Sequence, residues 1–207
     1  MGSATRRRLP KPERRRLIED TASALFAEHG YAETRLEDIA AGAGVTKQLL
    51  YQHFPSKKAL HMALLERHRD SLLAGLAEEM AAPEPLAQRL PRVLDRWFRY
   101  VEEQPYASAM LFKDTTGDAE LLAFHRELHA GARAANVALL RAEPELQIDD
   151  ARLEPLAELI RAAVTGLALW WAEHPEVPRA TLVDLSADLL ARGLGLTPAA
   201  AVPRPPP

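Results

Sequence analysis

The stretch AGAGVTKQLLYQHFPSKKAL, at positions 41–60, constrains the fold of this chain more than any other feature. Two glycines interrupt a helical pattern. The helix that follows them has room for only about two turns before Phe-Pro-Ser ends it. A helix this short is marginal by itself, so it must be held by packing against its neighbours. The stretch therefore predicts a helix–turn–helix whose short second helix, about 46–53, displays side chains to a partner.

The side chains that this short helix turns outward suit DNA. Successive residues lie ~100° apart around a helix, which places Lys47, Gln48 and Tyr51 on one side. The expected inner face consists of Val45, Leu49 and Leu50. Glutamine reads adenine, lysine reaches guanine, and a phenol reaches a phosphate. The alternative is a solvated face on a helix that only packs.

The flanking sequence completes a small N-terminal domain. Residues 1–12 are rich in arginine and proline and read as a flexible basic arm, which either contacts DNA or is a solubilising tail. Apolar spacing predicts a helix over 13–29 that stops at Gly30, and Thr34 with Glu37 predicts a capping box for the next helix. Ser56 is expected to cap a long helix that runs to Met80, and Lys57 at its start is positioned for a phosphate.

Further apolar stripes predict an all-α chain of about nine helices. They lie near 86–101, 106–112, 121–139, 156–171 and 182–189. No segment shows a convincing strand pattern or an internal repeat. The expected domains are a helix–turn–helix domain at 13–58 and a larger helical domain at 59–196. Residues 197–207 read as a disordered Pro/Ala tail.

Composition excludes several classes of protein. The chain of 207 residues has no cysteine, and no apolar run approaches the ~18 residues of a membrane span. The basic N-terminus lacks the apolar core of a secretory signal, so a cytoplasmic location is expected. Residues 1–60 carry a net charge of +4 and the remainder −7, which predicts that only the front of the chain meets a polyanion.

Between Arg14 and Leu60 the chain resembles the DNA-binding domain of the TetR family of bacterial transcriptional regulators. The matching segments are LFAEHGYAETRLEDIAAGAGV and VTKQLLYQHFPSKKAL. The resemblance implies an all-helical homodimer with a DNA-binding front and an effector-binding back. It assigns DNA contacts, or a place beside the phosphate backbone, to eight residues: Thr34, Arg35, Thr46, Lys47, Gln48, Tyr51, His53 and Lys57. Arg35 and Leu49 depart from the small hydroxyl residues common in the family.

The larger domain carries no catalytic motif, so we expect no enzyme, no cofactor and no metal. Aromatic residues and histidines gather there and predict an apolar effector pocket with a few polar groups. The candidate pocket residues are Trp97, Tyr100, Met110, Phe112, His125, His129 and Trp170, with Asn136 and Asp114 as further polar candidates. His125 and His129 lie four residues apart, which leaves three readings: a core histidine, an effector contact or a metal site.

The last two long helices suit dimerisation. The penultimate helix is apolar on too many sides for a surface helix, and its small residues Ala162, Ala163, Thr165 and Gly166 permit close approach of another helix. The expected dimer contacts are Ile160, Val164, Leu167, Leu185 and Leu189. A symmetric dimer would pair these faces in a four-helix bundle.

The leading functional hypothesis is a homodimeric repressor that a small, largely apolar effector releases from an inverted-repeat operator. A second hypothesis keeps the DNA binding but makes the protein an activator or an effector-independent regulator. A third, from another class, is an enzyme or ligand carrier in which the helix–turn–helix only packs. Loss of DNA binding on Lys47→Ala and Tyr51→Ala, with the fold intact, would exclude the third.

Overall fold

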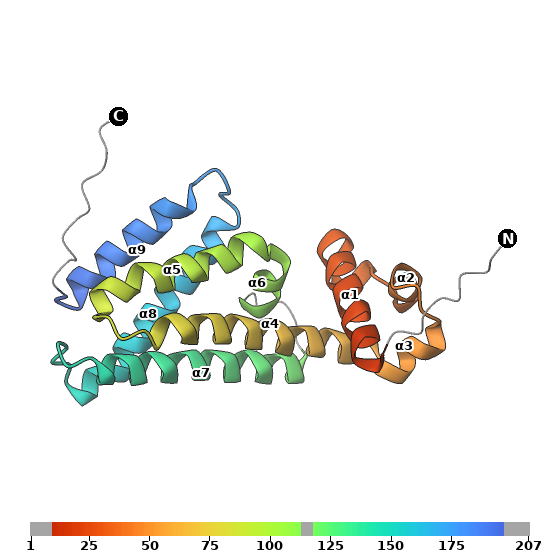
Figure 1. Ribbon diagram of the computed structural model, residues 1–207, viewed down its shortest axis with the longest axis horizontal. Coiled ribbons are helices and arrows are strands. Elements are labelled where there is room, and N and C mark those ends of the chain that lie inside the picture. The colour runs from red at the N-terminus through yellow and green to blue at the C-terminus, as the bar shows by residue number, and fades with distance from the viewer. Residues whose placement is uncertain (1–9, 113–117, 197–207) are drawn as a thin grey trace. The chain divides into compact units, whose positions relative to one another are not determined.

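The computed structural model describes residues 10–112 and 118–196. Over these ranges the chain forms nine α-helices and no strand, which confirms the predicted all-α fold (Figure 1). The helices are α1 (Lys11–Glu33), α2 (Leu36–Gly42), α3 (Lys47–His53), α4 (Lys57–Met80), α5 (Leu86–Glu103), α6 (Pro105–Phe112), α7 (Ala119–Ala142), α8 (Asp150–Trp171) and α9 (Arg179–Gly193). Most of the predicted arm and the whole predicted tail lie outside the described residues, but Lys11 and Pro12 belong to α1 and not to an arm. None of the described helices is long and apolar enough to cross a membrane.

The chain divides into two compact units. The boundary lies within α4, after Arg67, and not at residue 58 as expected. The first turns of α4 supply three fully buried leucines, Leu60, Leu64 and Leu65. Arg67 then donates to Asp20 of α1 at 2.7 Å. The start of α4 is therefore part of the first unit's core, because its apolar side chains have no other cover there.

The end of α1 differs from the simple stop that the sequence predicts. Gly30 has φ 79° and ψ 160°, a backbone conformation that favours glycine, and the helical hydrogen bonding resumes after it to Glu33. The Thr34 hydroxyl donates to the carbonyl oxygen of Gly30 at 2.8 Å. The predicted capping box is therefore wrong: Thr34 completes α1, and Arg35 stands at the N-cap of α2 without a side-chain cap.

The turn between α2 and α3 follows the predicted glycine chemistry. Gly42 lies so close to α1 that a Cβ added there would meet Thr21 Cγ2 at 2.8 Å, and Gly44 has a positive φ of 62°. The Thr46 hydroxyl accepts from the backbone N–H of Leu49 at 3.2 Å and so caps α3. Ser56 accepts from the N–H of Ala59 at 3.0 Å, as predicted for the start of α4.

In the second unit, α5 packs with α9 and α7 packs with α8. Asp118 and Asp149 cap α7 and α8 by accepting from backbone N–H groups of the first turn. Pro91 lies inside α5, which begins five residues earlier at Leu86. The buried side chains of α5, among them Leu94 and Phe98, form one stripe against this core.

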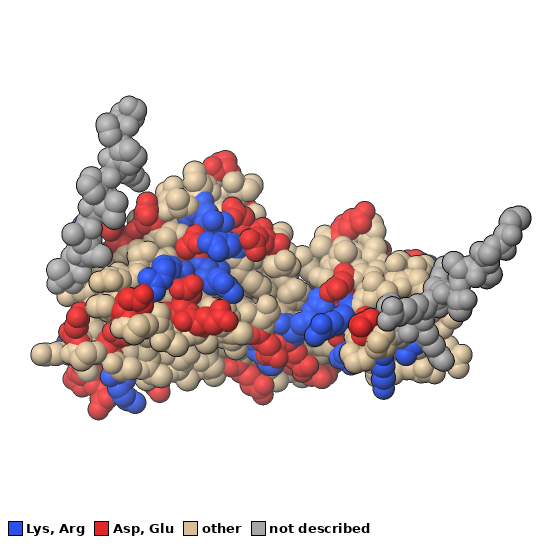
Figure 2. Space-filling view, viewed as in Figure 1, with Lys and Arg blue, Asp and Glu red and all other residues tan. Residues whose placement is uncertain are grey.

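Ion pairs fasten α9 to α5 on the surface of this unit. Arg179 donates to Asp95 at 3.0 Å and also to Glu102, and Arg92 donates to Glu79 at 3.2 Å. Figure 2 shows basic and acidic side chains side by side over α5 and α9. Each exposed pair contributes little stability, but together they leave this arginine-rich face largely neutralised.

Candidate nucleic-acid interface and ligand cavity

The exposed face of α3 carries the three side chains that the helical spacing predicts to point outward. Lys47 and Gln48 are exposed, and Tyr51 is 42% exposed, whereas Leu50 is fully buried. Packing of Leu50 in the core therefore fixes the rotation of a helix too short to be stable alone. The result is a compact helix that presents an ammonium, an amide and a phenol to a partner.

Lys47 is held in place by an acidic residue of α2. Its ammonium donates to the Glu37 carboxylate and lies 5.9 Å from the centre of the Tyr51 ring. The hydrogen bond from Lys47 lowers the pKa of Glu37, and the same bond raises the pKa of Lys47. Lys47 is thus fully charged and positioned before any partner arrives, and an anionic partner would replace Glu37.

Thr34 and Arg35, both expected beside DNA phosphates, have opposite environments. The Thr34 side chain is only 2% exposed, and its hydroxyl donates to carbonyl oxygens of α1. It has no surface for a phosphate, so the structure argues against this contact. Arg35 is exposed and remains available to a phosphate.

Lys57, expected to reach a phosphate, instead closes the end of α1. Its ammonium donates to three carbonyl oxygens, those of Tyr31 at 2.7 Å, Ala32 at 3.0 Å and Thr34 at 3.0 Å. It also lies 4.5 Å from the centre of the Tyr31 ring. An ammonium has three donors, and all three are used here. Lys57 is therefore a structural clamp and not a free phosphate ligand.

A basic cluster at the start of α1 surrounds His53, the last residue of α3. Burial lowers the pKa of the half-buried His53 imidazole, and the charges of Lys11, Arg14 and Arg15 lower it further. Arg14 and Arg15 were not among the residues predicted to contact DNA. The run of three arginines at 14–16 was the available signal, but its closeness to α3 depends on the packing of α1.

We expect this cluster to make the first unit less stable in acid. The lowered pKa keeps His53 neutral in the folded state, while the unfolded chain takes up a proton near pH 6.5. The free energy of unfolding should therefore fall as the pH drops from 7.5 to 5.5, and His53→Gln should reduce that fall. Urea titrations at both pH values measure it, with the exposed His29→Gln as control. Equal pH dependence in all three proteins would contradict the prediction.

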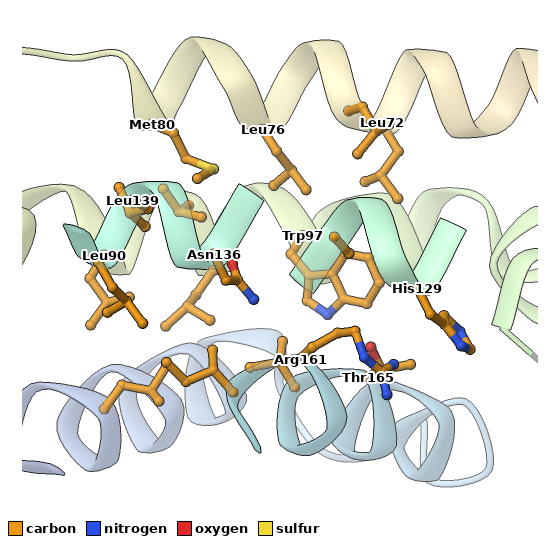
Figure 3. Close-up of a pocket in the computed structure, with 18 of the residues that line it drawn as sticks. Leu72, Leu76, Met80, Leu90, Trp97, His129, Asn136, Leu139, Arg161 and Thr165 are labelled. Carbon is orange, nitrogen blue, oxygen red and sulfur yellow. The ribbon is translucent and has the colours of Figure 1, made fainter. Parts of the chain in front are cut away.

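The second unit encloses a cavity of about 170 Å³. Side chains of α4 to α9 line it, and most are aliphatic (Figure 3). The polar residues at its wall are His129, Asn136, Arg161 and Thr165. An apolar cavity with a few polar groups is the usual form of a small-molecule site.

Three of the seven predicted pocket residues line this cavity: Trp97, Phe112 and His129. The rings of Trp97 and Phe112 meet edge to face with centroids 5.0 Å apart.

The other four predicted pocket residues lie elsewhere. The buried His125 donates from Nε2 to the Met110 carbonyl oxygen at 3.1 Å, which matches the reading of a core histidine. Tyr100 does not line the cavity, and burial of its hydroxyl raises the pKa of its phenol. Trp170 is 45% exposed and stacks on His174. Asp114 lies outside the described residues. Across the described residues, no three His, Asp or Glu side chains form a group that could hold a metal ion.

On α8 the most exposed large apolar residue is not among the predicted dimer contacts, whereas on α9 the predicted contacts are exposed. Ile160 and Val164 line the cavity and are half-buried. The neighbouring Leu159 is 64% exposed, and on α9 Leu185 and Leu189 are 59% and 65% exposed, as a dimer contact requires. Leu167 is half-buried. A shift of one residue turns a helix by ~100°, which is enough to exchange the inner and outer positions.

Comparison with known proteins agrees with this geometry. The family described as bacterial regulatory proteins, tetR family, matches residues 18–64. FasR of Mycolicibacterium smegmatis, an HTH-type transcriptional activator, is 27% identical over 95% of this chain and 90% of its own length. KstR2 of Mycobacterium tuberculosis, an HTH-type transcriptional repressor, is 32% identical, but the match covers only 49% of this chain and 50% of KstR2.

Solved structures share the fold over most of the chain. A tetR-family transcriptional regulator from Streptomyces coelicolor has a TM-score of 0.73 and 27% identity, covering 89% of this chain and 81% of that one. FadR from Bacillus subtilis has a TM-score of 0.69 over 86% of this chain and 98% of its own, and its 18% identity shows the fold alone. The named relatives are transcriptional regulators and not enzymes. Residues 18–64 therefore match the tetR family of bacterial regulatory proteins, and over most of its length the chain is similar to TetR-family DNA-binding transcriptional regulators.

Proposed function

We propose that the protein is a homodimeric repressor that binds an inverted-repeat operator and is released when a small apolar molecule fills the cavity. The observation that carries the proposal is the exposed face of α3, where Lys47, Gln48 and Tyr51 stand on a helix fixed by a buried leucine. In a helix–turn–helix such a second helix enters the major groove. Because the partner would be chromosomal DNA, we place the protein in the cytoplasm.

Dimer formation is supported by the exposed apolar face of α8 and α9. Leu159, Leu185 and Leu189 are each more than half exposed, although large apolar side chains on a monomer's surface are usually scattered singly. On α8, Ala163 and Gly166 are small and exposed, so another helix could approach closely. A two-fold axis would pair this face with itself and cover all of it.

Release by a ligand is supported by the cavity and by the course of α4. Leu72, Leu76 and Met80 of α4 line the cavity, while the first turns of the same helix belong to the core of the first unit. A ligand that fits one position of α4 better than another would change the freedom of the DNA-binding unit. FadR from Bacillus subtilis, which shares the fold, has been solved with stearoyl-CoA, so the fold accommodates a ligand with a long acyl chain.

Activation is the second candidate, and one comparison favours it. The activator FasR matches nearly the whole chain, whereas the repressor KstR2 matches about half. The face of α3 serves either role, since the sign of regulation depends on where the operator lies relative to the promoter. Mapping the selected site against the transcription start would separate the two: overlap supports repression, and an upstream site supports activation.

Selection of bound duplexes from a random DNA pool at near-physiological salt tests the proposal. We expect an inverted repeat with half-sites separated by about one helical turn or a multiple of it. Enrichment without symmetry would contradict the dimeric reader. Salt-dependent binding without any enriched sequence would mean that the basic N-terminal part of the chain binds phosphates without recognising bases.

Removing the Lys47 ammonium should weaken operator binding without unfolding the protein. A specific base or phosphate contact from this side chain contributes ~1–3 kcal/mol, so Lys47→Ala should lower affinity about tenfold. Fluorescence anisotropy on the selected duplex measures it. The control is Arg141→Ala, which removes an exposed cation of the second unit paired with Asp150. Equal affinity of Lys47→Ala and the wild type would remove Lys47 from the interface.

A further inference from the structure

Most polar groups of the cavity lie toward one end. In Figure 3, Met80, Leu90 and Leu139 line one end, whereas Trp97, His129, Arg161 and Thr165 gather at the other. Asn136 lies between the two groups, and its amide nitrogen donates to the Ala157 carbonyl oxygen at 3.4 Å. A ligand in this space therefore meets an aliphatic wall on one side and hydrogen-bonding groups on the other. Its own polar atoms would have to lie at the second end.

Trp97 contributes a hydrogen-bond donor that the protein leaves unused. The side chain is only 8% exposed, and its indole Nε1 is buried with no hydrogen-bond partner. Figure 3 shows this nitrogen on the ring edge that faces α8 and Arg161. Buried donors are nearly always paired, so an unpaired indole N–H at a cavity wall points to an acceptor supplied by a ligand.

Arg161 adds donors beside it, and its own charge is paired with Glu158, whose carboxylate also lies 3.8 Å from the 40% exposed side chain of Arg133. Its Nε and Nη2 both donate to the Glu158 carboxylate, which neutralises the guanidinium and lowers the pKa of Glu158. Its third nitrogen, Nη1, still carries two N–H groups. A buried anion needs a charge partner that is not already paired. The Trp97–Arg161 end thus favours a neutral oxygen acceptor over a carboxylate.

We propose that the cavity takes a compact apolar molecule with a neutral carbonyl oxygen, such as a ketone or an ester. The oxygen accepts from Trp97 Nε1 and Arg161, and the apolar body lies against Met80, Leu90 and Leu139. The volume of about 170 Å³ suits this, because a cavity of ~150 Å³ holds a benzene ring. The inference rests on the cavity being the effector site of the proposed function.

Acetophenone and ethylbenzene form a matched pair of probes, since they have nearly the same shape and differ by a carbonyl oxygen. Calorimetric titration of the full chain should show acetophenone binding about tenfold more tightly. Transfer from water alone favours the opposite order, because ethylbenzene is the more apolar molecule. Equal affinities, tighter binding of ethylbenzene or no binding of either probe would overturn the proposal. Benzoate should bind more weakly than acetophenone, and tighter binding of benzoate would overturn the neutral acceptor.

Trp97→Phe tests which group supplies the donor. The variant keeps an aromatic ring and loses the N–H, so the preference for acetophenone should disappear. The affinity for ethylbenzene reports any change of cavity shape in the same variant. The quantity to compare is therefore the ratio of the acetophenone affinity to the ethylbenzene affinity. Phe112→Leu, which alters the wall without removing a donor, should keep the tenfold ratio. A preserved ratio in Trp97→Phe would contradict the role of the indole. DNA is absent from this assay, so failure of the regulatory proposal would appear separately in the duplex selection.

Discussion

Replacement of both Leu185 and Leu189 by glutamate should convert the proposed dimer to monomers and weaken binding to the proposed inverted-repeat operator about a thousandfold. Two linked DNA-binding units bind about 10²–10⁴ times more tightly than one, because the second unit meets its half-site at a high effective concentration. A monomer loses that factor even if each reader is intact. The DNA-binding surface lies in the other unit and is not altered by either substitution.

The expected size of this effect follows from the position of the two leucines. They are 59% and 65% exposed and lie one turn apart on α9, near an equally exposed apolar stretch of α8. A symmetric interface uses the same patch twice, so two substitutions place four carboxylates in it. Burial of unpaired carboxylates is unfavourable enough to prevent association. The folded monomer is spared, because both side chains already face outward.

A control with the same chemistry is available on α7. Ala134 and Ala138 are exposed and have the same four-residue spacing, so Ala134→Glu with Ala138→Glu adds the same charge elsewhere. Sedimentation at micromolar concentration should give a monomer for the α9 variant and a dimer for the control. On a duplex with a single half-site, the α9 variant should retain the affinity of one wild-type reader. A dimeric α9 variant would place the interface elsewhere.

The features that could be predicted from the sequence are set by neighbouring residues. The outward face of α3 follows from its periodicity, and the caps at Thr46 and Ser56 follow from hydroxyl residues that precede helical segments. The glycine turn before α3 likewise depends on residues next to it, since Gly44 needs a positive φ. Such interactions reach no farther than four residues, so one sequence contains all that they require.

The errors concern the rotation of α8 and the contacts of side chains between helices. After Arg161, α8 has no charged residue to show which of its sides faces inward, and Ile160 and Val164 were placed outward although they line the cavity. His125 and Tyr100 shared the aromatic composition of a pocket, but composition does not say which side of a helix faces a cavity. The partner of the His125 ring is a backbone carbonyl 15 residues away, which no local pattern reports.

Replacement of Lys57 by methionine should destabilise the first unit by about 3 kcal/mol. The change removes three hydrogen bonds from an ammonium to the carbonyl oxygens that end α1, and bonds to a charged group contribute ~1.5–3 kcal/mol each when well shielded. Partial exposure lowers the total. Methionine keeps the length of the side chain, so packing on Tyr31 is preserved and the lost interactions are those of the ammonium.

The measurement must separate the two units. All three tryptophans, Trp97, Trp170 and Trp171, belong to the second unit, so their fluorescence reports unfolding there and should be unchanged by Lys57→Met. Hydrogen exchange of the amides of Ile18 and Ala22, whose side chains are fully buried in the first unit, should accelerate about a hundredfold. Unchanged exchange would show that the clamp contributes no stability.

Comparison with Lys47→Met decides whether Lys57 is a clamp or a DNA ligand. A lysine that meets a phosphate releases a counterion, so its loss reduces the salt dependence of binding by about one ion. Lys47→Met should leave amide exchange unchanged, and a reduced salt slope would show that it meets a phosphate. Lys57→Met should accelerate exchange, but at temperatures where the first unit stays folded it should keep the wild-type salt slope, because its ammonium already binds three carbonyl oxygens. A reduced salt dependence of DNA binding with unchanged amide exchange in Lys57→Met would instead show that Lys57 contacts DNA. In that case DNA would readily replace the carbonyl oxygens that its ammonium binds in the free protein.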